Sequence, residues 1–198
     1  MSNFNPNDRY ARRAKEEGYK ARSVYKLQAI QERYHLLKPG MKVLDLGCAP
    51  GSFLQYISEQ VGEKGLAIGI DLQKVEDLEP ENILTYQGDI YDDLLYKKIV
   101  QENKIEKFDF ITSDLAPRTT GIKFLDGGAS LDLNLIVLDT AKSYLKKGGG
   151  VVMKILSGFN EGDLLGEARK IFKTVKKYRP QAIRKSSGES YIICLNKN

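Results

Sequence analysis

Short apolar runs alternate with longer segments of mixed polarity along most of this chain, and that alternation limits the folds open to it. Each run has the length and composition of a buried strand, and most intervening segments are long enough for a helix. Strands are predicted at residues 42–46, 66–70, 83–87, 108–113, 150–155, 175–178 and 190–195. Helices are predicted at or near residues 21–34, 52–61, 92–103, 131–146 and 161–172. The pattern indicates an α/β fold: a mostly parallel, seven-stranded sheet with an antiparallel last strand and helices on both faces.

The first twenty residues are basic and polar, and are predicted to form an arm, mobile or partly helical, ahead of a single domain at residues 21–198. A chain of 198 residues suits one domain with a sizeable core. Residues 116–130, rich in glycine, are predicted to be a long loop at the carboxyl end of a strand. The sequence shows no secretory h-region and no apolar run that could span a bilayer, so no membrane partner is expected.

Cysteine and histidine are scarce, which limits the chemistry open to the chain. Cys48 and Cys194 suggest no disulfide framework, and that fits a reducing cytoplasm. His35 is the single histidine, so His-based triads and His-rich metal sites are poor candidates and no metal is expected.

Positive charge is concentrated at the two ends of the chain. Residues 1–42 carry a net charge of +6 and residues 169–198 a net charge of +8, whereas residues 43–168 carry −9. Basic ends suit a phosphate backbone, so we expect RNA as a partner, although an ordinary solvated surface would have similar charges. The candidate RNA contacts are Arg9, Arg12, Arg13, Lys20, Arg22, Arg118, Arg184 and Lys185.

Four charged residues far apart in the sequence are expected to meet. Asp114 and Lys154 each follow or end an apolar run, and the carboxyl ends of parallel strands form the ligand crevice of such a sheet. Glu189 precedes the last run, so an antiparallel last strand would start at the same edge. Lys26 would join them from the first predicted helix. Such a cluster can shift the pKa of a lysine, although two structural ion pairs are the plainer alternative.

A glycine-containing segment, D-L-G-C-A-P-G at residues 45–51, links the first predicted strand to the helix that follows. Its glycines allow a tight turn and close approach to NAD, FAD or S-adenosylmethionine. The G-x-G-x-x-G fingerprint of dinucleotide sites is absent. Asp71 and Asp89 follow the next two strands, where they are placed to bind ribose hydroxyls and an adenine amino group, while Asp45 could reach an ammonium group. Each Asp alone could equally be a turn residue.

The combined motifs resemble the RrmJ/FtsJ family of RNA ribose 2′-O-methyltransferases, a branch of the class I S-adenosylmethionine-dependent methyltransferases. The resemblance covers roughly residues 21–195. It rests on D-L-G-C-A-P-G together with Y-K-L at 25–27, S-D-L-A-P at 113–117, V-V-M-K at 151–154 and E-S-Y at 189–191. It implies a single-domain, Rossmann-like class I methyltransferase fold.

The resemblance assigns the family's catalytic K-D-K-E tetrad to Lys26, Asp114, Lys154 and Glu189. Lys154 would touch the 2′-oxygen, either as a neutral base or as a charged group that stabilises the oxyanion. Asp114 would orient Lys154 and border the methyl group. Glu189 and Lys26 would complete the charge pattern and position the ribose.

The resemblance further implies S-adenosyl-L-methionine as methyl donor, S-adenosyl-L-homocysteine as product, and a uridine of large-subunit ribosomal RNA as target for an enzyme that we expect to be a monomer. The expected cofactor contacts are Asp45, Gly47, Ala49, Pro50, Gly51, Phe53, Asp71, Leu72, Asp89, Ile90 and Asp114. Phe53 stands where bacterial members often carry Trp, and Arg118 where they usually carry Asn. Two alternatives stay open: a methyltransferase for mRNA caps or another RNA, and a non-catalytic RNA-binding assembly factor.

Overall fold

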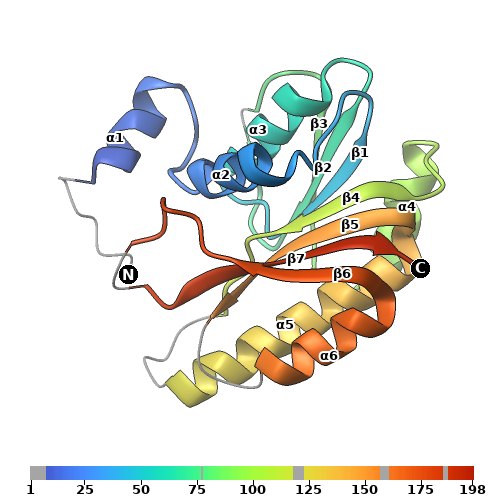
Figure 1. Cartoon of the computed structure of the whole chain (residues 1–198). Helices are drawn as coiled ribbons and strands as arrows, with labels where there is room; N and C mark the ends of the chain where they lie inside the picture. Colours follow the sequence, from blue (N-terminus) through green and yellow to red (C-terminus); the bar gives the residue numbers. More distant parts are fainter. Residues whose placement is uncertain (1–7, 77, 118–122, 157–160, 185–186) are drawn as a thin grey trace.

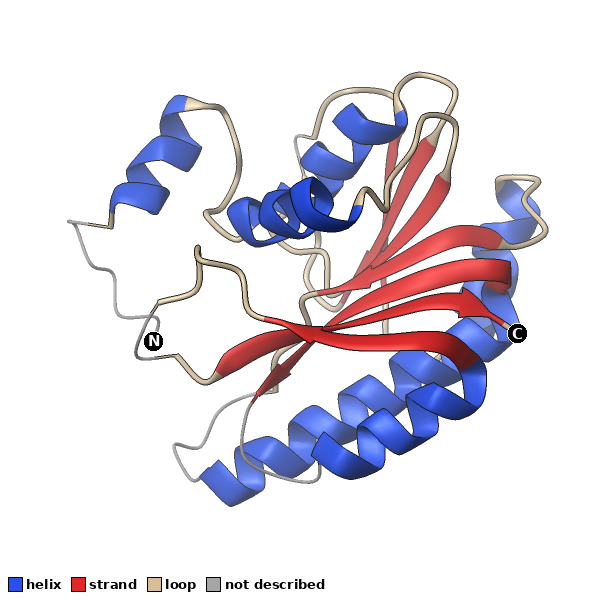
Figure 2. Cartoon of the chain, in the orientation of Figure 1, coloured by secondary structure: helices blue, strands red, loops and turns tan. Residues whose placement is uncertain are grey.

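A computed structural model describes residues 8–76, 78–117, 123–156, 161–184 and 187–198 (Figure 1). One seven-stranded sheet runs through the molecule, in the order β3-β2-β1-β4-β5-β7-β6 (Figure 2). The strands are β1 (Lys42–Leu46), β2 (Leu66–Asp71), β3 (Ile83–Gln87), β4 (Phe108–Ser113), β5 (Leu145–Leu156), β6 (Phe172–Tyr178) and β7 (Glu189–Lys197).

The strand directions place the ends of distant segments at one edge of the sheet. β3, β2, β1, β4 and β5 pair in parallel, and β7 pairs antiparallel with both β5 and β6. The carboxyl ends of β1 to β5 therefore share an edge with the start of β7. The predicted sheet and its antiparallel last strand are confirmed.

Helices cover both faces of the sheet (Figure 2). They are α1 (Arg9–Glu16), α2 (Val24–Tyr34), α3 (Ser52–Val61), α4 (Asp93–Glu102), α5 (Lys123–Tyr144) and α6 (Glu161–Ile171). Side chains of α4, α5 and α6 join one buried apolar cluster, and those of α1, α2 and α3 join another. The sheet therefore separates two cores, and no helix in the described segments is long and apolar enough to cross a bilayer.

Alternation along the strands supplies both cores. In β5, Val151 and Met153 belong to the cluster under α4–α6, whereas Val152 belongs to the cluster under α1–α3. Successive side chains of a strand point to opposite faces, so a strand covered on both sides needs apolar residues at every position. This requirement explains why the central strands β5 and β7 contain the continuous apolar runs V-V-M and Y-I-I-C-L.

The turn after β1 depends on two glycines. Gly47 has φ 76° and Gly51, directly before α3, has φ 109°, a region that other residues rarely adopt. A Cβ atom on Gly47 would lie 2.5 Å from Leu115 Cδ2, and one on Gly51 would lie 2.7 Å from Leu78 Cδ1. The glycines thus let the backbone pass close to the segments that follow β4 and β2.

Some predicted boundaries were wrong. The loop expected at residues 116–130 is shorter, because α5 already begins at Lys123, eight residues before the predicted start at 131. β5 begins at Leu145 rather than at Gly150. β6 begins at Phe172, directly after α6. The expectation that the N-terminal arm is partly helical is confirmed by α1.

Candidate active site

The four charged residues expected to converge do so at the edge where β4 and β5 end and β7 begins. Lys154 Nζ lies 3.1 Å from Asp114 Oδ1, and Lys26 Nζ lies 2.9 Å from Glu189 Oε2. Lys26 Nζ also lies 3.7 Å from Asp114 Oδ1. One Asp114 oxygen therefore links the two pairs, and the cluster combines two ammonium groups with two carboxylates.

The fold explains why these residues meet. Asp114 directly follows β4, and Lys154 lies near the end of β5, its parallel neighbour. Glu189 opens β7 and pairs in register with Leu156, two residues beyond Lys154. Lys26 lies in the first turns of α2, whose apolar side packs into the cluster that covers one face of the sheet. The ion pairs thus join three strand ends and one helix.

Tyr191 completes the surroundings of Asp114 and was not predicted as a site residue. Its hydroxyl donates a hydrogen bond of 2.5 Å to Asp114 Oδ1, and the residue is fully buried. Burial raises the pKa of Tyr191 well above its ordinary value, so the phenol stays protonated and keeps donating. Burial would also raise the pKa of Asp114, but the charges of Lys154 and Lys26 and the Tyr191 bond outweigh it and hold that pKa low. The only sequence signal was the place of Tyr191 in the E-S-Y motif.

Asn134 of α5 fixes the main chain at Lys154. Its side-chain amide donates to Lys154 O at 3.0 Å and to Ser130 O at 2.7 Å, and it is buried. Lys154 itself is only 6% exposed, and its ammonium also donates to the main-chain oxygen of Asp114. The lysine is therefore constrained at its backbone and at its charged end.

A cavity of about 490 Å³ lies beside this cluster, at the carboxyl ends of β1, β2 and β4. Seven of the expected cofactor contacts line it: Gly47, Ala49, Asp71, Leu72, Asp89, Ile90 and Asp114. Five lining residues were not predicted: Gln73, Tyr91, Leu115, Ala116 and Leu133. Four of these follow predicted residues within two positions, so proximity in the chain was a usable signal. Leu133 comes from α5, and no sequence motif pointed to it.

Asp71 and Asp89 line the cavity and also stabilise turns. Asp71 accepts hydrogen bonds from Ala49 N at 2.9 Å and Gln73 N at 2.8 Å. Asp89 accepts one from Tyr91 N at 3.1 Å. Short polar side chains commonly bond nearby backbone groups in this way. The turn role and the cavity role are compatible, because the bond to Ala49 holds the segment after β1 against the end of β2.

Four other expected cofactor contacts do not line this cavity. Asp45 is buried in β1, and Phe53 packs into the apolar cluster under α1–α3. Gly51 directly precedes α3, and Pro50 lines a separate hollow that also contains Lys20. The walls of the cavity come from the turns after β1, β2 and β3, from the segment after β4 and from α5.

Asp45 has an unusual environment. Thr112 Oγ1 donates a hydrogen bond of 2.6 Å to Asp45 Oδ1, whereas Asp45 Oδ2 has no hydrogen-bond partner among the described residues. Burial, with the nearby charges of Asp114 and Asp71, raises the pKa of Asp45 to about 8 despite the Thr112 bond. The carboxyl is therefore mostly protonated at neutral pH, and its second oxygen is buried behind the cavity wall.

The predicted RNA contacts lie in three places. Arg9, Arg12 and Arg13 are exposed on α1, where Arg12 pairs with Glu16 at 3.7 Å and Arg13 with Glu17 at 2.7 Å. Lys20 borders the hollow beside Pro50. Arg118 and Lys185 lie outside the described residues.

A groove of about 350 Å³ is lined by Arg22, Ser23, Lys26, Ile183, Arg184, Ser187 and Glu189. Two predicted RNA contacts thus share a groove with two tetrad residues.

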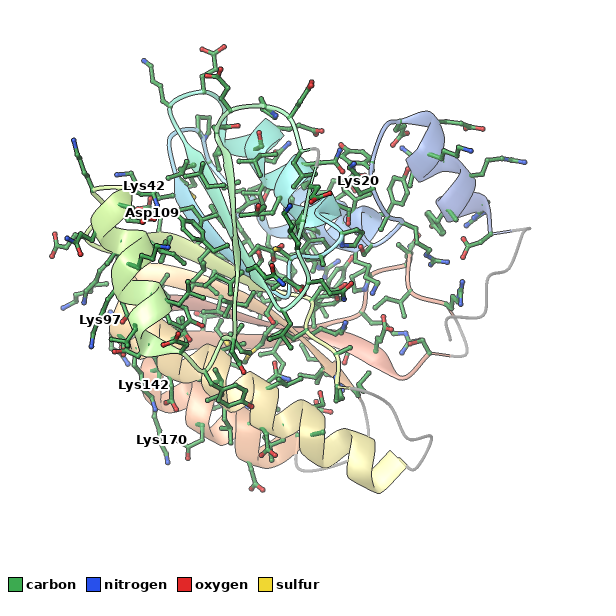
Figure 3. All side chains as sticks on the ribbon, turned by 180° about the vertical axis from the view of Figure 1, so that it is seen from behind. Lys20, Lys42, Lys97, Asp109, Lys142 and Lys170 are labelled. Carbon is green, nitrogen blue, oxygen red and sulfur yellow. The ribbon has the colours of Figure 1, made fainter. Side chains whose placement is uncertain are left out.

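Three lysines on the opposite side of the molecule have local carboxylate partners. Figure 3 shows Lys97, Lys142 and Lys170 on the helical side formed by α4, α5 and α6, away from Lys20. They pair with Asp93 at 2.6 Å, Asp139 at 2.7 Å and Glu167 at 2.5 Å, respectively. These pairs neutralise charge within one helical turn, so this side of the molecule is a weaker candidate for RNA than the groove.

No three His, Cys, Asp or Glu side chains among the described residues are grouped so that they could hold a metal ion. Both cysteines are free and buried, and Cys48 packs against the backbone of Gly69.

Known proteins resemble this chain over most of its length. A model of the FtsJ-like methyltransferase family matches residues 19–197. A protein named ribosomal RNA large subunit methyltransferase E from Syntrophobacter fumaroxidans is 45% identical over 186 residues, covering 94% of this chain and 93% of that protein. One of the same name from Bdellovibrio bacteriovorus is 40% identical over 194 residues, covering 98% of each.

Solved structures show the same fold. A protein assigned as a ribosomal RNA methyltransferase from Plasmodium falciparum superposes with a TM-score of 0.81 at 30% identity, covering 90% of this chain and 98% of that chain. A fibrillarin from Aeropyrum pernix, solved with natively bound S-adenosyl-L-methionine, gives a TM-score of 0.60 at 18% identity, covering 87% and 76%. The second likeness concerns the fold alone.

Proposed function

The chain belongs to the FtsJ-like methyltransferase family, and from this premise we propose that it transfers a methyl group from S-adenosyl-L-methionine to a ribose 2′-hydroxyl, that of a uridine in large-subunit ribosomal RNA. The observation that carries the proposal is the position of Asp114. Its side chain lines the 490 Å³ cavity and contacts Lys154 Nζ at 3.1 Å. A methyl donor in the cavity and a hydroxyl at the lysine would therefore meet at one carboxylate.

The cavity residues fit S-adenosyl-L-methionine. Carboxylates suit a ligand that carries a sulfonium, an ammonium and ribose hydroxyls, and Asp71 and Asp89 line the cavity. The unpartnered Oδ2 of Asp45 lies in the strand that leads into the cavity's turn. Asp71 and Asp89 would hold the ribose and adenine, and Gly47 and Ala49 would pass close to the amino-acid part. When bound, the cofactor supplies an activated methyl group.

The chain's own residues would align and polarise the hydroxyl. Lys154 can either accept its proton as a neutral amine or remain charged and stabilise the oxygen as negative charge develops. The resting arrangement favours the charged role, because Lys154 Nζ contacts two oxygens of Asp114. Lys26 and Glu189, at the groove, would position the ribose. Holding the reacting atoms about 3 Å apart accounts for a large part of such catalysis.

The RNA would enter along the groove. Arg22 and Arg184 lie there beside Lys26 and Glu189, and the exposed arginines of α1 would extend the basic surface. Arg118 and Lys185 belong to the same proposal on sequence grounds. The proposal also includes a monomer in the cytoplasm, with residues 1–20 as an arm on one catalytic domain. The free cysteines fit a reducing cytoplasm. The family match over residues 19–197 supports a single domain that begins near the end of the arm.

The test is to map ribose methylation after incubating the chain with labelled cofactor and one of three substrates: naked ribosomal RNA, isolated large subunits, or total cellular RNA that includes capped mRNA. We expect label at a ribose of one large-subunit nucleotide, and far less of it with Lys154→Ala. Label in an mRNA cap would redirect the proposal to the alternative substrate. Cofactor and RNA binding with no transfer to any RNA would favour the non-catalytic assembly factor.

A further inference from the structure

Asp8 ties three distant segments together beside the groove. It precedes α1, and its Oδ1 accepts hydrogen bonds from Tyr10 N at 3.1 Å and Ala11 N at 3.3 Å. Its Oδ2 accepts from Arg184 Nη2 at 2.9 Å and from Arg22 Nη1. The Asp8 side chain is 7% exposed. A single carboxylate from the arm thus satisfies both a helix N-terminus and two guanidinium groups.

The two arginines differ in what holds them besides Asp8. Arg22 Nη2 donates to Ala182 O at 2.6 Å, so its guanidinium has a second anchor. Only the main chain of Arg184 is held, by Arg179, whose Nη2 donates to Arg184 O at 3.1 Å, and its side chain is 49% exposed. Both arginines line the groove that contains Lys26 and Glu189. Two cations, one of them anchored, therefore meet at Asp8 in the groove that also holds Lys26 and Glu189.

Converging guanidinium groups suit a phosphate as well as a carboxylate. Arginine presents several donors in a rigid fork, and charge-assisted bonds of this kind are among the strongest in proteins. Although burial would raise the pKa of Asp8, its bonds to Arg184 and Arg22 hold that pKa below its ordinary value, so the carboxylate is charged at neutral pH. A phosphodiester of RNA has the same charge as the Asp8 carboxylate and, like it, two charge-bearing oxygens that can each accept from a guanidinium.

We propose that Arg22 and Arg184 form a subsite for an RNA phosphate, and that Asp8 of the chain's own arm occupies this subsite when RNA is absent. The subsite rests on the proposed function, because its ligand is the RNA substrate. Asp8 competes with the phosphate, so the apparent affinity for RNA is reduced by the fraction of molecules in which the subsite is filled. Entry of the RNA displaces the carboxylate and detaches the start of α1 from the groove.

The variant Asp8→Asn tests this competition. Asparagine is as good an N-cap as aspartate, so α1 keeps its first hydrogen bonds while the charge is lost. We expect the dissociation constant for a single-stranded RNA oligonucleotide to fall about threefold or more at low salt. Because the RNA displaces Asp8 from the intact chain as well, both proteins contact the same phosphates in the complex, and their logarithmic salt slopes should be similar.

Glu16→Gln is the matched control. It makes the same change of charge on the same arm, but Glu16 pairs with Arg12 at 3.7 Å and is 67% exposed. Because this exposed pair restrains Arg12 only weakly, Glu16→Gln should raise RNA affinity less than Asp8→Asn does. Adding Arg184→Gln to Asp8→Asn should abolish the increase in affinity. Circular dichroism of every variant checks that α1 and the fold persist.

The outcomes separate the two proposals. Binding by Asp8→Asn that is equal to or weaker than that of Glu16→Gln would overturn the subsite, and would make Asp8 an organiser of the arginines instead. Methyl transfer by the intact chain is measured in parallel. Tighter RNA binding by Asp8→Asn without any methyl transfer would uphold the subsite and count against the proposed reaction.

Discussion

Lys154 is held at both its charged end and its main chain. Its ammonium contacts Asp114, and its main-chain oxygen is fixed by Asn134. We expect Lys154→Ala to reduce turnover by roughly a hundredfold or more, the scale of a positioned acid–base group. Cofactor affinity should change little, because Lys154 does not line the cavity. Single-turnover kinetics and calorimetry measure the two quantities, and near-normal turnover in a folded variant would refute the assignment.

Asn134 should affect catalysis without touching any ligand. Asn134→Ala removes the bonds to Lys154 O and Ser130 O, so the end of β5 can shift relative to Asp114. Since a displacement of about 1 Å can cost about a hundredfold, we expect turnover to fall about tenfold or more, with cofactor affinity preserved. Thr140→Val is the control: it changes a buried polar group of α5 that bonds Tyr96 instead. Equal losses in both variants would indicate general destabilisation.

Asp45 should make the stability of the apo-protein fall as pH rises. Its pKa is about 8 in the folded chain and about 3.9 when unfolded. Between these values the folded state keeps a proton that the unfolded state has lost, so the free energy of unfolding decreases by at most about 1.4 kcal/mol per pH unit. Above pH 8 the loss is complete. Asp45→Asn cannot ionise at this position. The free energy of unfolding of the variant, measured with urea, should therefore rise relative to that of the intact chain between pH 5 and pH 8. Parallel pH profiles would contradict this.

At the scale of elements, α1 is more than a charged tail. Its Ala14 is buried, and Tyr10 packs against Tyr25 of α2 with 5.4 Å between ring centroids. The guanidinium of Arg13 lies 4.7 Å from the Tyr25 ring centroid. Because the helix presents its basic side chains from a docked position, it can extend the groove rather than move independently of it.

Deleting residues 1–20 should weaken RNA binding and flatten its salt dependence, because the loss of Arg9, Arg12 and Arg13 outweighs the removal of the competing Asp8. Cofactor binding should survive, since none of the cavity residues lies in the arm. The deletion and Asp8→Asn are therefore expected to act in opposite directions, although both alter the same segment. Titrations at several salt concentrations give the slopes, and a thermal melt shows the stability lost with Ala14. Unchanged slopes would exclude the arm from the RNA site.

Element boundaries were predictable where composition and structure agreed. β1, β3 and β4 match their predicted bounds because each is a short, mostly apolar or β-prone segment flanked by polar or turn residues. β5 was shortened in the prediction because K-K-G-G-G reads as a turn. In the structure this stretch forms an irregularity, since Phe108 pairs with Leu145 but Phe110 pairs with Gly150. Tertiary pairing, which local sequence does not encode, decides that start.

For the molecule as a whole, the charged residues of the site were easier to predict from the sequence than the apolar residues that line the cavity. The tetrad could be inferred because strand ends in a parallel sheet must share an edge. Phe53 was expected at the cofactor and instead packs in the core, while Leu133 of α5 lines the cavity. Which side of a helix faces a cavity depends on how the helix docks. Tyr191 was visible as a motif letter, but its bond to Asp114 depends on the register of β7.

The strand order has a consequence for biosynthesis. β7 lies between β5 and β6, so β6 has no strand neighbour until residues 189–197 have been made. Glu189 and Tyr191, which complete the surroundings of Lys26 and Asp114, arrive with the same segment. Domains generally fold as units. A nascent chain that ends before β7 lacks Glu189 and Tyr191, so it cannot assemble the charge cluster however much of the sheet it already contains. The cluster can therefore be complete only after residues 189–197 have been made.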